Sequence, residues 1–108
     1  HDLGEFAGGT MGLDYACSMN DLIYAGEAGV VDWVGYHGGY GNLVRVTHPN
    51  GYQTYYAHLN AFAVSVGQTV YQGQVVGYCG TTGISTGTHL HYEIRLNGVP
   101  QNPKHYEP

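Results

Sequence analysis

Two histidines separated by one residue are the part of this sequence best suited to chemistry. They lie in residues 88–95, which read THLHYEIR. Polar and apolar residues alternate there, and this pattern predicts a half-buried strand with His89 and His91 on the same face. Two imidazoles side by side on a rigid face can bind a metal or transfer protons. The alternative interpretation is a surface strand whose two histidines are solvated.

Two further residues are candidates for the same chemistry. Asp14 lies among apolar residues of a predicted strand, where aspartate is depleted, so it is either a turn or cap residue or a metal ligand. His58 ends another predicted strand, over residues 52–59. Period-two counting along that strand places Thr54, Tyr56 and His58 on one face, with His58 at its end and at the rim of a candidate site.

The elements that must position these residues are strands and tight turns. The chain of 108 residues contains 18 glycines and 11 tyrosines, and no window has a helical stripe. We therefore expect an all-β fold with an antiparallel sheet as its core, in a single domain over residues 1–108. Residues 1–10 are expected to be an N-terminal loop and residues 104–108 a tail. Strands are predicted at residues 11–17, 22–25, 29–35, 43–47, 52–59 and 88–95, with short strands within 63–78.

Composition excludes several classes of function. The net charge is −5 with only three basic residues, which argues against nucleic-acid binding. No apolar run approaches the roughly 20 residues of a membrane-spanning helix, so membrane insertion is not expected. No signal-peptide pattern is found, and the chain starts with His1. We therefore expect a processed chain, or one domain of a longer protein.

Cys17 and Cys79 are the only cysteines. In a glycine- and tyrosine-rich chain with a single lysine they suggest an exported protein with one disulfide. Two free buried thiols remain the alternative, since spacing alone does not establish pairing.

Several motifs in one order carry a resemblance to a known family. They are GLDYA at 12–16, YGNLV at 40–44, YAHL at 56–59, VGQTVYQGQVVG at 66–77 and GTTGISTGTHLHYEIR at 80–95. Over residues 11 to about 103 the chain closely resembles the M23 family of zinc metallopeptidases, the lysostaphin-like or LytM-type endopeptidases.

The resemblance implies a sheet flanked by loops that form a narrow groove. It also implies one Zn²⁺ per chain and hydrolysis of peptide bonds in peptidoglycan cross-bridges or stem peptides. Peptidoglycan peptides would be the partners, and the protein would be a monomer or one domain of a larger protein. The implied location is extracellular, in the cell envelope or on a phage particle.

The family's site residues can be carried over position by position. Asp14 and His91 match zinc ligands, while His58 and His89 match the histidines beside the metal-bound water. The family's first ligand, the histidine of His-x-Gly-x-Asp, is replaced here by Thr10. A catalytic zinc normally has three protein ligands, and a neutral hydroxyl is a poor substitute for imidazole.

Three explanations of this departure stay open. His1 could supply the third ligand, because glycines between it and Asp14 would let the chain fold back, with His37 as second choice. The domain could instead be a catalytically impaired relative that binds cell-wall peptides or a protein partner. Zinc could also bind only together with substrate. A carrier domain of the biotinyl or lipoyl type is excluded, because it needs a lysine at a hairpin tip and the only lysine is Lys104.

The remaining polar residues near these motifs have structural interpretations. His48, before a Pro-Asn-Gly turn, is expected to be solvated, as is His105 in the tail. Glu93 and Arg95 are expected to form a cross-strand ion pair or a solvated face.

Overall fold

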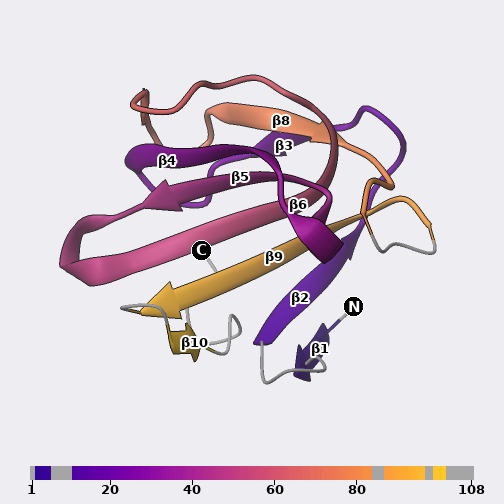
Figure 1. The fold of residues 1–108 in the computed structure, drawn as a ribbon, viewed down its shortest axis with the longest axis horizontal. Coiled ribbons are helices and arrows are strands. Elements are labelled where there is room, and N and C mark those ends of the chain that lie inside the picture. The colour runs from indigo at the N-terminus through magenta and orange to yellow at the C-terminus, as the bar shows by residue number, and fades with distance from the viewer. Residues whose placement is uncertain (1, 6–10, 84–86, 97–98, 102–108) are drawn as a thin grey trace.

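A computed structural model describes residues 2–5, 11–83, 87–96 and 99–101. Within these residues ten strands join into one antiparallel sheet, whose main path runs β1-β2-β9-β6-β5-β4-β7 (Figure 1). Off this path, β10 pairs with β9, and β8 pairs with both β3 and β6. The predicted all-β antiparallel fold is confirmed. The elements are β1 (Asp2–Glu5), β2 (Met11–Ala16), β3 (Leu22–Tyr24), β4 (Gly29–Tyr36), η1 (Gly38–Tyr40), β5 (Asn42–Thr47), η2 (Pro49–Gly51), β6 (Tyr52–Phe62), β7 (Thr69–Val70), β8 (Val75–Cys79), β9 (His89–Leu96) and β10 (Val99–Gln101).

The predicted N-terminal loop is wrong over residues 2–5, which form β1 at the end of the main path, beside β2. Backbone pairing satisfies N–H and C=O groups without requiring a period-two side-chain pattern, so the residue types at 2–5 carry no sign of this strand. The tail at 104–108 lies outside the described residues.

The hydrophobic core lies between one face of the main sheet and the β3–β8 pair, which Figure 1 shows above the other strands. Tyr56 of β6 and Tyr92 of β9 face it, with ring centroids 5.4 Å apart. A smaller buried cluster lies on the other face of the sheet, where Tyr40 covers Leu43, Tyr55 and Ala57. None of the helices in the described residues has the length and apolar character needed to cross a membrane.

His48 is buried rather than solvated, with only 4% of its surface exposed. One ring nitrogen, Nδ1, lies 2.6 Å from the Ala28 carbonyl, and the other lies 2.8 Å from the Thr54 hydroxyl. The turn that follows His48 is η2. The side chain of His48 turns back toward the core, because both of its ring nitrogens have partners there.

Candidate functional site

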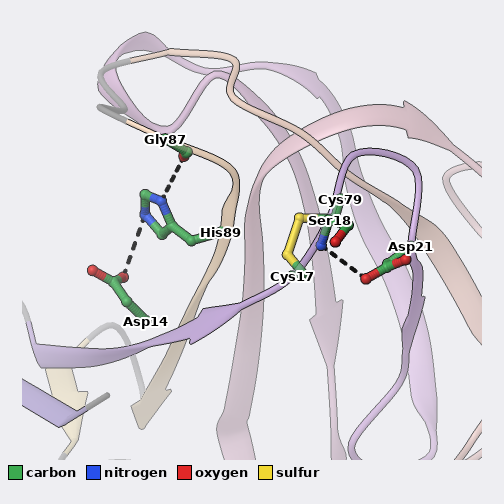
Figure 2. Close-up of a disulfide and its surroundings, with 7 residues drawn as sticks. All are labelled: Asp14, Cys17, Ser18, Asp21, Cys79, Gly87 and His89. Atoms are coloured by element: carbon green, nitrogen blue, oxygen red, sulfur yellow. Dashed lines mark hydrogen bonds and ion pairs between the residues drawn. A yellow bond between two sulfur atoms is a disulfide. The ribbon is translucent and has the colours of Figure 1, made fainter.

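Asp14 and His91 lie directly opposite each other in the β2–β9 pair. The Asp14 Oδ1 atom is 3.0 Å from His91 Nδ1 and 3.6 Å from His89 Nε2. Figure 2 shows the His89 ring between Asp14 and the loop above it, with Nδ1 donating to the Gly87 carbonyl at 2.9 Å. The shared face predicted for the two histidines therefore brings both beside the one carboxylate of the neighbouring strand.

His58 joins this cluster through an irregularity of β6. Its backbone has φ = 63°, in the left-handed region that residues other than glycine seldom adopt. In the pairing with β5, one extra residue of β6 lies between Tyr56 and Leu59. The bulge re-aims the side chain, as bulges beside active sites often do, and the His58 ring lies 5.0 Å from that of His89 and 6.0 Å from that of His91.

The predicted face of His58 is therefore wrong. Thr54 and Tyr56 point into the core, where their hydroxyl groups lie 3.2 Å apart, whereas His58 reaches the opposite face. Period-two counting assumes an unbroken ladder, and the sequence around residue 58 contains no glycine to mark the bulge.

Thr82 fixes the His58 ring from the loop after β8. The His58 Nδ1–H donates to the Thr82 carbonyl at 2.7 Å, which leaves Nε2 as the nitrogen directed at the cluster. The Thr82 hydroxyl donates to the Leu59 carbonyl at 2.7 Å and accepts from the Asn42 N–H at 3.0 Å. Thr82 thus ties its loop to β5 and β6 at the point where the bulge occurs.

The loops beside the site touch each other through two glycines. Gly41 has φ = 65° and Gly83 has φ = 74°, both in the left-handed region. A Cβ on Gly41 would lie 2.3 Å from the Thr82 carbonyl carbon, and one on Gly83 would lie 2.3 Å from the Gly41 nitrogen. Only glycine allows this backbone contact, which joins residues 38–41 to residues 80–83.

Glu93 lies behind His91 and is fully buried. Its Oε1 is 2.9 Å from His91 Nε2, its Oε2 accepts from Arg95 Nε at 2.9 Å, and the Tyr40 hydroxyl reaches both oxygens. The predicted ion pair of Glu93 and Arg95 forms, but within β9 rather than across two strands, and the predicted solvated face is wrong because Glu93 is buried. The two-residue spacing of Glu93 from His91 was the available signal for the contact between them.

The surroundings shift the pKa values of His58 and His91 in opposite directions. Burial lowers the pKa of His58 below its ordinary value, although the hydrogen bond to Thr82 acts in the opposite direction. Burial also acts to lower the pKa of His91, but the hydrogen bonds to Glu93 and Asp14 outweigh it and the pKa is raised. At neutral pH His58 is therefore an uncharged proton acceptor, whereas His91 has a carboxylate at each ring nitrogen.

A disulfide between Cys17 and Cys79 braces the cluster (Figure 2). It joins the residue after β2 to the end of β8, with a Cα–Cα distance of 6.4 Å. Cys17 follows Asp14 by three residues, so the bridge pins the strand of the carboxylate to the strand that leads into the Thr82 loop. Of the two alternatives left open by the sequence, the structure has the disulfide.

The donor set fits part of a zinc site. Two ligands of a tetrahedral zinc, each at about 2.1 Å, lie roughly 3.4 Å apart, so Asp14 Oδ1 and His91 Nδ1 at 3.0 Å can share one ion with a small adjustment. Among the described residues, however, no group of three His, Cys, Asp or Glu side chains has the arrangement of a complete metal site. The proposed third ligand His1 and the altered position Thr10 both lie outside those residues. The ring contacts found for His37 are with Trp33 at 5.1 Å and Tyr40 at 5.7 Å.

Curated proteins with related sequences include cell-wall enzymes and an activator. The chain is 50% identical over 92 residues to the DD-carboxypeptidase/endopeptidase Mpg of Neisseria meningitidis, covering 85% of this chain and 21% of that protein. It is 39% identical over 108 residues to the murein hydrolase activator NlpD of Salmonella typhimurium, covering 99% of this chain and 28% of that protein. The chain thus spans between about a fifth and somewhat more than a quarter of the length of these relatives.

Solved structures with a similar fold are also peptidases, as are the enzymes among the related sequences. The catalytic domain of the antimicrobial peptidase lysostaphin from Staphylococcus simulans superimposes with a TM-score of 0.86 at 29% identity, over 98% of this chain and 84% of that one. A zinc-containing peptidase from Vibrio cholerae gives a TM-score of 0.80 at 32% identity, over 90% and 32% of the two chains. The family model for peptidase family M23 matches residues 8–103. From this match, the relatives and the histidine–aspartate cluster together, we conclude that the chain belongs to peptidase family M23.

Proposed function

We propose that this chain is a zinc-dependent endopeptidase domain that hydrolyses peptide bonds in the cross-bridges or stem peptides of peptidoglycan. The observation that carries the proposal is the contact of Asp14 Oδ1 with His91 Nδ1 at 3.0 Å, with the rings of His58 and His89 beside it. The substrate class is suggested by the names of the relatives, among them the murein hydrolase activator NlpD, since murein is peptidoglycan. The expected location is the cell envelope, the extracellular space or a phage particle.

Asp14 and His91 would hold the zinc, with His1 as the proposed third ligand. When bound, zinc would act as a Lewis acid that polarises a peptide carbonyl and lowers the pKa of a water molecule, so that the water can attack the carbonyl. The carboxylate of Asp14 brings negative charge to the ion, and the imidazole of His91 brings the second donor atom.

His58 and His89 divide the proton transfers. The His58 ring is neutral at pH 7 because burial lowers its pKa, and its Nδ1–H is committed to the Thr82 carbonyl, so Nε2 can accept a proton from the attacking water. His89 donates its Nδ1–H to the Gly87 carbonyl, and its Nε2 lies beside the Asp14 carboxylate. A proton on Nε2 can be donated to the developing oxyanion or to the leaving amine.

A second candidate function is a catalytically impaired domain that binds cell-wall peptides or a protein partner. Two observations favour it: Thr10 stands where the family has its first ligand, and a relative covering 99% of the chain is named a murein hydrolase activator.

Zinc stoichiometry together with digestion of isolated cell-wall sacculi tests the two candidates. The enzyme proposal expects one zinc per chain and release of peptide fragments, both lost in Asp14→Asn. A zinc content well below one per chain with intact sacculi would reject the enzyme and favour the binding domain.

A further inference from the structure

The carboxylate of Glu93 is the most completely enclosed charged group near the histidine cluster. None of its surface is exposed. Its Oε1 accepts hydrogen bonds from His91 Nε2 and from the Tyr40 hydroxyl, both at 2.9 Å. Its Oε2 accepts one from Arg95 Nε at 2.9 Å. Arg95 Nη2 also donates to the Tyr40 oxygen at 3.0 Å, which closes the ring of contacts. Both oxygens of the carboxylate are therefore held by donors.

Burying a carboxylate this deeply costs free energy unless its partners compensate. An ion pair alone does not explain the burial, because Arg95 is partly exposed and could pair with a carboxylate at the surface. What the enclosed position adds is the contact to His91. Each side of that ring then faces a carboxylate, Asp14 at Nδ1 and Glu93 at Nε2.

The consequence for His91 is a fixed ring plane. When Nε2–H donates to Glu93, Nδ1 is the nitrogen left to offer its lone pair to an ion held beside Asp14. Partners of this kind, behind a ligand histidine, set its orientation and raise its basicity. Resting on the proposed function, we propose that Glu93 is a positioning residue for the metal site, held in place by Tyr40 and Arg95.

Tyr40 extends this unit to the wall of the site. It lies in η1, whose coil crosses over β6 and β9 in Figure 1, and its ring lies 6.0 Å from that of His91. The same hydroxyl bonds Glu93 and Arg95. The loop at residues 38–41 and the metal ligand are therefore joined through a single carboxylate.

The test is the zinc dissociation constant of the purified chain, measured by competition with a chromophoric chelator, together with the thermal midpoint of the zinc-free chain. Glu93→Gln keeps the size of the side chain but removes the charge and presents an amide N–H₂ to donors. We expect zinc to bind about 10–100-fold more weakly, as for other partners behind a ligand histidine. Tyr40→Phe keeps Glu93 and removes one donor, so a smaller loss is expected.

Asp32→Asn is the matched control. It removes the carboxylate of another ion pair, in which Asp32 Oδ1 lies 2.6 Å from Arg45 Nε. The other contacts of the Asp32 carboxylate are to Thr47 and Gln53. This variant should bind zinc within about twofold of the wild type.

The outcomes distinguish the positioning role of Glu93 from the enzyme proposal. A Glu93→Gln variant with a lower thermal midpoint but wild-type zinc affinity overturns the positioning role and leaves the enzyme proposal standing. An equal loss in Asp32→Asn also overturns it, because the effect would then be one of general charge. A wild-type chain without zinc affinity rejects the enzyme proposal, and the role of Glu93 falls with it. If Glu93→Gln does not fold, unchanged zinc affinity in Tyr40→Phe overturns the inference.

Discussion

The rings of His58 and His89 lie 5.0 Å apart, although counting residues along β6 would turn His58 into the core. The left-handed backbone at His58 makes the difference. The two histidines thus meet through a conformation that carries a cost for any residue with a Cβ.

Substitution at His58 should reveal that cost. His58→Gly removes the Cβ where φ is positive, whereas His58→Ala keeps it. We expect the free energy of unfolding of the glycine variant to exceed that of the alanine variant by about 1 kcal/mol, the reverse of the usual order within a strand. Chemical denaturation of both zinc-free variants measures this. If alanine is the more stable, the bulge in β6 is not as described.

Substitution of a metal ligand and substitution of a proton carrier should have different effects on zinc binding. His91→Ala is expected to lose zinc, because it removes a donor atom. His89→Ala should retain zinc and lower turnover by about 10²–10⁴-fold, the usual contribution of a general acid or base. Metal analysis and peptide hydrolysis on the same preparations distinguish them. Equal loss of zinc in both variants would show that the assigned roles are wrong.

Restoring the family's ligand at position 10 tests the departure in this sequence. Thr10→His should raise zinc affinity sharply if Thr10 occupies the vacant ligand position, because imidazole binds zinc far better than a neutral hydroxyl. Chelator competition on the wild type and the variant gives the comparison, with Thr10→Ser as control. An unchanged affinity would mean that another group, such as His1, already completes the site.

Tyr40 should make the fold sensitive to alkali. Burial, reinforced by the charge of Glu93, raises its pKa to about 12 from an ordinary value of 10.0. As the pH rises past 10 the unfolded chain loses this proton while the folded chain keeps it, so stability falls until about pH 12. Tyr40→Phe should show a smaller fall over that range. Denaturant midpoints on either side of pH 10 provide the measurement, and identical profiles would contradict it.

Removing the disulfide should cost stability. Cys17 and Cys79 are 62 residues apart, and closing a loop of this size stabilises by about 4 kcal/mol in the chain-entropy model. The double variant Cys17→Ser, Cys79→Ser should therefore unfold at a markedly lower denaturant concentration. Reduction of the wild type should reproduce the shift and leave the double variant unaffected.

Side-chain alternation was sufficient to predict the strand that carries His89 and His91, because that strand follows a regular ladder. It failed at His58, since a bulge without glycine leaves no mark in a pattern of residue types. It also failed at Glu93. Alternation shows which residues share a face, but the burial of that face depends on Tyr40, which comes from a loop far away in the sequence.

Four of the five residues assigned to the chemistry were candidates from residue type and spacing and received their roles from the family motifs, and the structure brings these four, Asp14, His58, His89 and His91, together from three strands. The groups that hold them in place had no assigned role, although both lie within the motif at 80–95. The carbonyl of Thr82 contacts His58 across 24 residues of sequence, and the carboxylate of Glu93 contacts His91 across two.

The contact between the backbones of Gly41 and Gly83 constrains how this domain can diversify. A residue inserted at the base of either loop would displace the other loop as well, and with it the carbonyl that holds His58. Side chains at 38–41 and 80–83 that lie away from this backbone contact can therefore be exchanged while the carbonyl that holds His58 stays in place.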